Sequence, residues 1–186
     1  MKCFGVLLVI LISLTGCSDS SKEIKRGMAL RTKLLQAESV QFDADITADY
    51  GDQLYLFSIA CQGNSQGDVT FTVTAPESIS GITGNISNEG GKLTFDDVAL
   101  QFDLMADDQL SPVSAPWILM KTLRSGYLTS AGMEEALLRL TIDDDYEDDA
   151  LQLDIWLDEQ DLPQQAEIVY DGRRILSLDV KKFVIS

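Results

Sequence analysis

The chain has 186 residues, of which 14 are basic, 30 are acidic and none is histidine, so its net charge is −16. Nucleic-acid phosphates are bound by clustered lysine and arginine, so an acidic chain of this kind is not expected to bind nucleic acid. The lack of histidine excludes Ser-His-Asp and Cys-His catalysis, together with histidine metal ligands. The sequence therefore predicts no catalytic residues, no cofactor and no metal site.

The first element in chain order is an apolar segment over residues 4–12, preceded by Lys2 and followed by Leu14-Thr15-Gly16-Cys17. It is shorter than the ~20 residues that span a bilayer, and its layout is typical of an export signal. The four residues that follow it resemble the lipobox of bacterial lipoproteins, in which a peptidase cuts before the cysteine and the thiol carries diacylglycerol. The resemblance implies a signal peptide over 1–16, lipidation of Cys17, and an extracytoplasmic protein anchored to the cell membrane or outer membrane. An ordinary secretory signal with an incidental Cys17 is the alternative.

The segment after Cys17 is predicted to be a lipidated tether over 17–21 and then an amphipathic helix over about 22–38. Residues 18–33 carry five basic and two acidic side chains, whereas residues 34–186 carry eight basic and 28 acidic ones. Two interpretations of the basic stretch stay open. In the first, it faces the lipid headgroups while the acidic remainder of the chain is held away from the membrane surface. In the second, it is only the solvated side of a helix.

From Val40 onward the apolar period changes from helical to two, which predicts antiparallel strands. Alternation and turn residues place strands over 40–50, 54–61, 69–75 and 79–87, and a strand or strand pair over 93–104. The segment 54–61 is apolar on both faces, so we expect both of its faces to be covered.

The second half of the chain is predicted to begin with an inserted helix over about 115–125, capped by Ser114. Strands follow over about 136–143 and 151–157, joined by an acidic hairpin tip at 143–149. A strand around 166–170, a hairpin turn at Asp171-Gly172 and a strand over 175–185 complete the sheet. No long linker interrupts residues 22–186, so one domain is expected.

This order of elements resembles the LolA/LolB-type superfamily of lipoprotein carriers. The closest stretch is 151–183, where Ile155-Trp156-Leu157-Asp158, Leu162-Pro163 and Asp171-Gly172 follow that family's ending. The resemblance implies an α+β fold, a curved antiparallel β half-barrel with an N-terminal helix and an inserted helix covering an apolar concave face. Anchored members of the superfamily include mycobacterial lipid-carrying lipoproteins and GerS-type spore lipoproteins, and the latter act through contacts with a cortex amidase.

Large apolar side chains are the candidate ligand-binding residues on that concave face. They come from four predicted strand segments and the inserted helix: Phe42, Phe57, Phe71, Phe95, Phe102, Trp117 and Met120. Such side chains line a pocket for a lipid or acyl chain, or they fill an ordinary core. Cys61 is expected to be a buried structural cysteine, because a thiol nucleophile needs an activating base. The acidic tip 143–149 is expected to be a solvated turn, since it lacks the spacing of a calcium loop.

Two functions follow as expectations. The first is a membrane-anchored carrier that binds a lipid, an acyl chain or a lipoprotein. The second is a non-catalytic interaction lipoprotein that regulates a cell-wall enzyme through an envelope protein partner or as a homodimer. An open apolar cavity would favour the carrier, and a packed concave face would favour the interaction protein.

Overall fold

The computed structural model describes residues 19–106, 109–146 and 150–186. The first half of this part consists of α1 (Asp19–Gln36), β1 (Ser39–Asp49), β2 (Leu54–Asn64), β3 (Val69–Ala75), β4 (Thr83–Ser87), β5 (Gly90–Phe95) and β6 (Val98–Phe102). The second half consists of β7 (Met105–Ala106), β8 (Gln109–Leu110), a short 3-10 helix η1 (Pro112–Ser114), α2 (Ala115–Ser125), β9 (Tyr127–Glu134), β10 (Leu137–Asp143), β11 (Gln152–Leu157), β12 (Pro163–Tyr170) and β13 (Arg173–Ile185).

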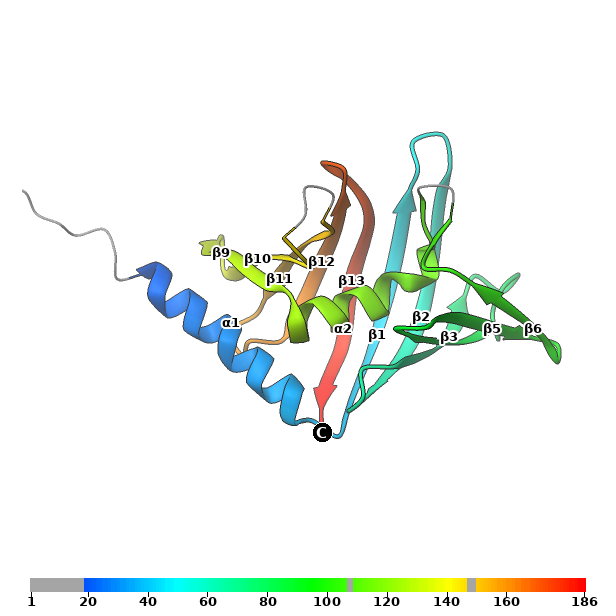
Figure 1. Cartoon of the computed structure of the whole chain (residues 1–186), viewed down its shortest axis with the longest axis horizontal. Helices are drawn as coiled ribbons and strands as arrows, with labels where there is room; N and C mark the ends of the chain where they lie inside the picture. The colour runs from blue at the N-terminus through cyan, green and yellow to red at the C-terminus, as the bar shows by residue number, and fades with distance from the viewer. Residues whose placement is uncertain (1–18, 107–108, 147–149) are drawn as a thin grey trace, which may run out of the picture.

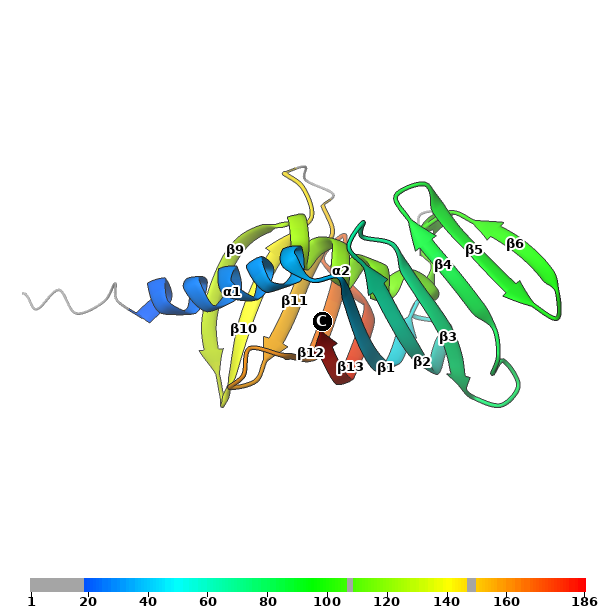
Figure 2. The same ribbon diagram turned by 90° about the horizontal axis from the view of Figure 1, so that it is seen from below.

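Eleven of these strands form one antiparallel sheet in the order β6-β5-β4-β3-β2-β1-β13-β12-β11-β10-β9. The sheet is curved and open, so β6 and β9 are its two edges (Figure 1; Figure 2). The first and last strands pair with each other at its centre, where the Glu38 N–H donates to the Ser186 carbonyl at 2.8 Å. The fold class expected from the sequence, an α+β half-barrel with an N-terminal and an inserted helix, is confirmed.

Both helices lie on the concave side of the sheet (Figure 1). Helix α1 packs against β9 and β10 at Gly27, where an added Cβ would lie only 2.9 Å from the Leu140 side chain. Helix α2 crosses the middle of the concave side and touches β2, β3 and β10. The two helices therefore cover the part of the sheet from β9 to β3 and leave β4 to β6 beyond them (Figure 2).

The core follows directly from the alternation in the sequence. In β1, Val40, Phe42, Ala44, Ile46 and Ala48 are all buried, and the residues between them are not. The same pattern holds in β3 and β10, because one face of each strand meets the helices and the other meets water. The two-residue hairpins at Asp96-Asp97 and Asp171-Gly172 have positive φ at both central positions, as type I′ turns require.

Several sequence-based expectations need correction. Helix α1 begins at Asp19, so most of the tether expected over 17–21 is helical. Strand β9 was not predicted, since its sequence has few apolar residues in alternation. Leu54, Tyr55 and Leu56 are exposed, because the start of β2 extends beyond both helices.

The inserted helix also differs from expectation at its N-terminus. Ser114 does not cap α2 through its side chain, because its hydroxyl donates to the Ser111 carbonyl at 2.6 Å. The preceding turn of 3-10 helix, η1, brings the chain into α2 instead.

Candidate functional site

Helix α2 fills the middle of the concave side. Eight of its 11 residues are buried, including Trp117 and Met120. Met120 lies over Gly63 of β2, where an added Cβ would be 3.7 Å from the Met120 methyl carbon. At the end of α2, the Arg124 guanidinium donates to the carbonyls of Asn64 at 2.9 Å and Ser65 at 2.7 Å. The sheet beneath α2 is therefore a packed core.

The apolar surface of the core continues past α2 along one row of paired residues. Phe42 pairs with Cys61 and Cys61 with Phe71, and the row runs on through Gly84 and Leu93 to Leu100 on β6. Phe42 is 2% exposed and Phe71 is 3% exposed, whereas Leu100 is 62% exposed. One continuous apolar row thus begins in the core and ends in solvent.

We call β5 and β6 together the β5–β6 flap. Its concave face carries five apolar side chains: Leu93, Phe95, Val98, Leu100 and Phe102. Glycines in the adjoining strands accommodate aromatic rings here, because an added Cβ at Gly84 would lie 2.4 Å from the Phe71 ring. An added Cβ at Gly91 would likewise lie 2.1 Å from the Phe102 ring. The flap is the place where apolar side chains on the concave side are accessible.

The seven predicted ligand-binding residues all lie on the concave side, but in two environments. Five of them are buried in the core: Phe42, Phe57, Phe71, Trp117 and Met120. The other two lie on the flap, where Phe95 is 45% exposed and Phe102 is half-buried. Sequence reasoning missed Val98 and Leu100, because it considered only large side chains. The alternation of apolar residues over 93–102 was the signal that could have identified them.

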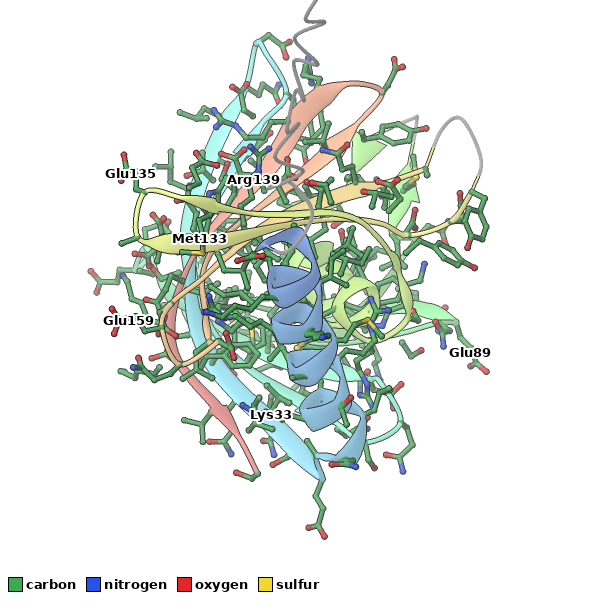
Figure 3. The ribbon with its side chains drawn as sticks, turned by 90° about the vertical axis from the view of Figure 1, so that its left-hand side faces the viewer. Lys33, Glu89, Met133, Glu135, Arg139 and Glu159 are labelled. Carbon is green, nitrogen blue, oxygen red and sulfur yellow. The ribbon has the colours of Figure 1, made fainter. Side chains whose placement is uncertain are left out.

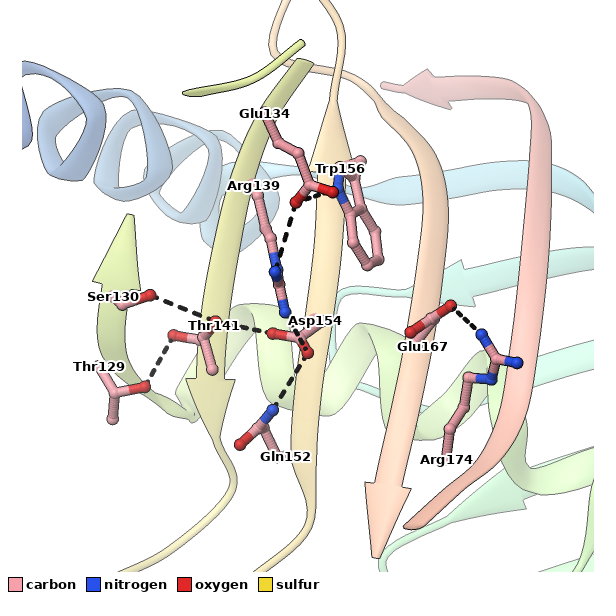
Figure 4. Close-up of polar contacts among 10 residues, drawn as sticks. All are labelled: Thr129, Ser130, Glu134, Arg139, Thr141, Gln152, Asp154, Trp156, Glu167 and Arg174. Carbon is pink, nitrogen blue, oxygen red and sulfur yellow. Dashed lines mark hydrogen bonds and ion pairs between the residues drawn. The ribbon is translucent and has the colours of Figure 1, made fainter. Parts of the chain in front are cut away.

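A polar network occupies the opposite face of the sheet, on β9 to β11 (Figure 4). The buried carboxylate of Asp154 accepts hydrogen bonds from Arg139 at 3.0 Å, Thr141 at 2.7 Å and Gln152 at 3.1 Å. The Arg139 guanidinium also pairs with Glu134 at 3.3 Å and lies 5.2 Å from the Trp156 ring centre. Since the Asp154 oxygens are occupied by protein donors, this network stabilises the pairing of the strands and leaves little room for a ligand.

An open hollow of about 950 Å³ also lies on this outer face, over β1 to β5. Its lining is about as polar as it is apolar, and its polar side chains include Gln62, Thr70, Thr72, Thr83, Asn85 and Lys92. Hydroxyl and amide groups do not favour the burial of an acyl chain. The hollow therefore does not match the apolar cavity expected of a carrier.

Nucleophilic and metal chemistry have little support in these side chains. Burial, together with the nearby charge of Asp43, raises the pKa of the Cys61 thiol well above its usual range, so the thiol stays protonated. Within the described residues, no group of three histidine, cysteine, aspartate or glutamate side chains is placed to hold a metal ion. Residues 147–149 of the acidic tip lie outside the described part.

Cys17, the predicted lipidation site, also lies outside the described residues. No helix within 19–106, 109–146 and 150–186 is both long enough and apolar enough to cross a membrane.

Comparison with known proteins gives similarity of structure only. No family model and no curated protein matches the sequence. A LolA superfamily protein from Nitrosomonas europaea is 11% identical over 86% of this chain and 93% of its own, with a TM-score of 0.46. A putative outer membrane lipoprotein-sorting protein domain from Vibrio parahaemolyticus is 7% identical over 90% and 94%, with a TM-score of 0.46. The Mycobacterium tuberculosis lipoprotein LppX is 11% identical over 89% and 96%, with a TM-score of 0.43.

Proposed function

We propose that this chain is a non-catalytic, membrane-anchored envelope lipoprotein that binds the apolar part of a ligand on the concave face of its β5–β6 flap. The anchor is a lipid on Cys17, and the ligand is an acyl chain of a lipid or of a lipoprotein. One observation carries the proposal. The apolar row that starts at Phe42 in the core becomes 62% exposed at Leu100 on the flap.

The position of the flap argues for a ligand that binds outside the packed core. Helix α2 is packed against the middle of the sheet as part of the core, so it leaves no room for a ligand there. An acyl chain would therefore bind beside α2 and against Leu93, Val98 and Leu100. Val98 is 71% exposed, which makes it the most accessible apolar side chain on the flap. An edge strand with accessible apolar residues promotes aggregation of a free protein, and a bound ligand or partner would cover those residues.

The expected affinity is modest. Complete burial of one large apolar side chain contributes roughly 1.5–3 kcal/mol. Phe95, Val98 and Leu100 are already partly buried, so a ligand covering all three would gain about 3–5 kcal/mol before the cost of association. An anchor in the same membrane as the ligand raises the effective ligand concentration and compensates for weak binding.

A non-catalytic role agrees with the inventory of side chains. The sequence contains no histidine, and the Cys61 thiol is buried and protonated. The buried carboxylate of Asp154 is committed to three hydrogen bonds within the protein.

A second candidate function is regulation of a cell-wall enzyme by direct contact. The observation that favours it is the combination of a packed concave side with an accessible edge strand, β6. An extended segment of a partner could add a strand to β6 and cover Val98 and Leu100 with its own side chains. Asp96, Asp97 and Asp103 surround this edge, so the partner segment would be basic as well as apolar.

Two variants on neighbouring positions of β6 test the proposal. Leu100→Glu puts a charge on the concave face of the flap, and Gln101→Glu puts the same charge on the outer face of the same strand. Each protein is purified from membranes and examined by native mass spectrometry for co-purifying lipid or lipoprotein. We expect the Gln101→Glu protein to retain an acyl ligand and the Leu100→Glu protein to lose it. Retention by both variants, or no acyl ligand in the unaltered protein, would refute the proposal.

A photo-crosslinking amino acid at position 100 separates the two candidate functions. Its counterpart at position 101 is the control. A crosslinked product whose mass increases by that of a lipid supports the carrier, and a product with one defined protein supports the regulator. A product that forms equally from position 101 counts against the flap as the binding surface.

A further inference from the structure

The exposed side of α1 has an apolar stripe that no other part of the described chain covers. On the side of the helix that packs against the rest of the protein, Leu30 is 1% exposed and Leu34 is fully buried. Ile24, Met28 and Leu35 are 43%, 45% and 56% exposed. Spacings of four and seven residues place these three side chains on one side of a helix. A helix that only met water on this side would not need three large apolar residues there.

Three exposed lysines lie on the remaining solvent-facing part of α1, beside the apolar stripe. Lys22, Lys25 and Lys33 are exposed, and no ion pair involves any of them within the described part of the chain. The two arginines of α1 are engaged with the body of the protein. Arg26 pairs with Asp161 at 2.6 Å, and the Arg31 guanidinium donates to the Leu123 carbonyl at 2.9 Å. The solvent-facing charge of α1 is therefore positive, although the chain as a whole is strongly acidic.

The contacts that hold α1 against the rest of the protein determine the direction in which its exposed surface faces. Arg26 also donates to the Asp158 carbonyl at 3.0 Å, so the helix is held to the loop between β11 and β12 as well as to β9 and β10. Figure 3 shows α1 at the front of its side of the molecule, with Glu89, Glu135 and Glu159 at the outline. In Figure 1, α1 runs along the lower left edge of the molecule, with the sheet on its other side.

The position of the predicted lipid identifies that flat surface. Helix α1 begins at Asp19, two residues after Cys17. Two residues of extended chain span about 7 Å at most. A lipid on Cys17 would therefore hold the first turn of α1 at the bilayer surface, with Lys22, Ile24 and Lys25 immediately beside it.

We infer that the exposed side of α1 is a membrane-contacting surface that binds a bilayer containing anionic phospholipid. Ile24, Met28 and Leu35 enter the boundary between headgroups and acyl chains, and Lys22, Lys25 and Lys33 contact the phosphates. The acidic remainder of the chain is repelled from the same surface. This inference extends the proposed membrane attachment, because it gives the anchored domain one fixed orientation.

A fluorescent residue in the full chain tests the inference. An environment-sensitive fluorescent amino acid is incorporated at position 28, and at position 56 in a matched control, because Leu56 is 61% exposed at the start of β2 and belongs neither to α1 nor to the flap. Each protein is purified from membranes and reconstituted into vesicles of phosphatidylcholine alone or of an equal mixture with phosphatidylglycerol. We expect blue-shifted emission and quenching by spin-labelled phospholipid at position 28 in the mixed vesicles, and neither effect at position 56.

Charge removal gives the second readout. In the variant Lys22→Gln, Lys25→Gln, Lys33→Gln, the population of docked α1 should fall about fivefold for each lysine at low salt. Unchanged docking in this variant, equal quenching at positions 28 and 56, or no quenching at position 28 would overturn the inference. An emission shift at position 28 that follows protein concentration instead of lipid would show a second copy on the stripe, which also overturns it.

Intact mass separates this inference from the proposed lipid anchor. A protein without an acyl group whose position 28 is still quenched would retain the helix surface and refute the anchor. An acylated protein whose position 28 is not quenched would retain the anchor and refute the helix surface.

Discussion

Replacing Asp154 with alanine should destabilise the protein far more than removing any surface carboxylate. Asp154 is 4% exposed, and its carboxylate accepts three hydrogen bonds from Arg139, Thr141 and Gln152 (Figure 4). Hydrogen bonds to a charged group contribute about 1.5–3 kcal/mol each, but those on one carboxylate do not add. The Arg139 side chain is 42% exposed and keeps its contact with Glu134, which limits the loss.

These contacts place the cost of Asp154→Ala at about 2–4 kcal/mol of unfolding free energy. For a chain of this size, each kcal/mol shifts the melting temperature by about 2–4 °C. A loss near 3 kcal/mol would therefore lower it by roughly 6–12 °C. Asp154→Asn keeps the volume, but it removes the charge and replaces one acceptor oxygen with an N–H₂ group, which would face either Thr141 or the Arg139 and Gln152 donors, so most of the loss should remain.

Urea denaturation followed by Trp156 fluorescence measures this cost. The control is Glu167→Ala, because Glu167 pairs at 2.6 Å with an Arg174 side chain that is 59% exposed. Surface ion pairs contribute about 0–1 kcal/mol, so the control should change little. If Asp154→Ala costs no more than Glu167→Ala, the network is not the stabilising element inferred here.

Two further predictions concern other parts of the sheet. Gly84→Ala should destabilise the protein by about 1–3 kcal/mol, because the added methyl group would lie 2.4 Å from the Phe71 ring. Gly132→Ala should be tolerated, because a methyl group added at Gly132 would have no neighbouring atom within 4 Å. Thermal melts of the two variants give the comparison, and an equal loss in both would contradict the packing argument. The hydrogen bond from Lys181, and after it the one from Ser58, hold the pKa of Asp45 below its usual range. The ionised carboxylate therefore stabilises the folded protein at pH values above the pKa that Asp45 has in the unfolded chain. This stabilisation is lost as the pH falls through the lower pKa that Asp45 has in the folded protein. Asp45→Asn should therefore reduce stability at neutral pH and not at strongly acidic pH, and a loss that is the same at both would show that titration of Asp45 is not involved.

The elements that were predictable are those whose sequence pattern depends on one local environment. Strand β1 alternates strictly because one face meets the helices, and helix α2 is apolar on most of its surface because it lies inside the half-barrel. The hairpin at Asp171-Gly172 is likewise encoded locally, since its two residues tolerate positive φ.

The features that were not predictable depend on register and on position in the sheet. Strand β9 is an edge strand whose Thr129, Ser130 and Gly132 carry no apolar alternation, and the following Glu-Glu-Ala sequence favours a helix. The Asp154 network joins residues of different strands, so it becomes visible only when the pairing of Thr141 with Asp154 is known. Leu54 and Leu56 look like core residues in sequence, but β2 extends past the helices that would cover them.

The candidate site shows the same division. Large aromatic residues were correctly expected on the concave side, because strand parity determines the face. Which of them remain accessible depends on how far α2 reaches across the sheet. This length does not appear in any strand's own sequence, so Val98 and Leu100 were overlooked while the buried Phe42 was proposed.

The pairing of β13 between β12 and β1 has a consequence for biogenesis. Without β13, the sheet would separate into a piece ending at β1 and a piece beginning at β12, each with an uncovered seam of apolar residues. Because a polypeptide is synthesised from its N-terminus, β13 is made after every other strand. Assembly of the half-barrel must then wait until residues 173–185 are available, and both unfinished pieces expose apolar side chains during that interval.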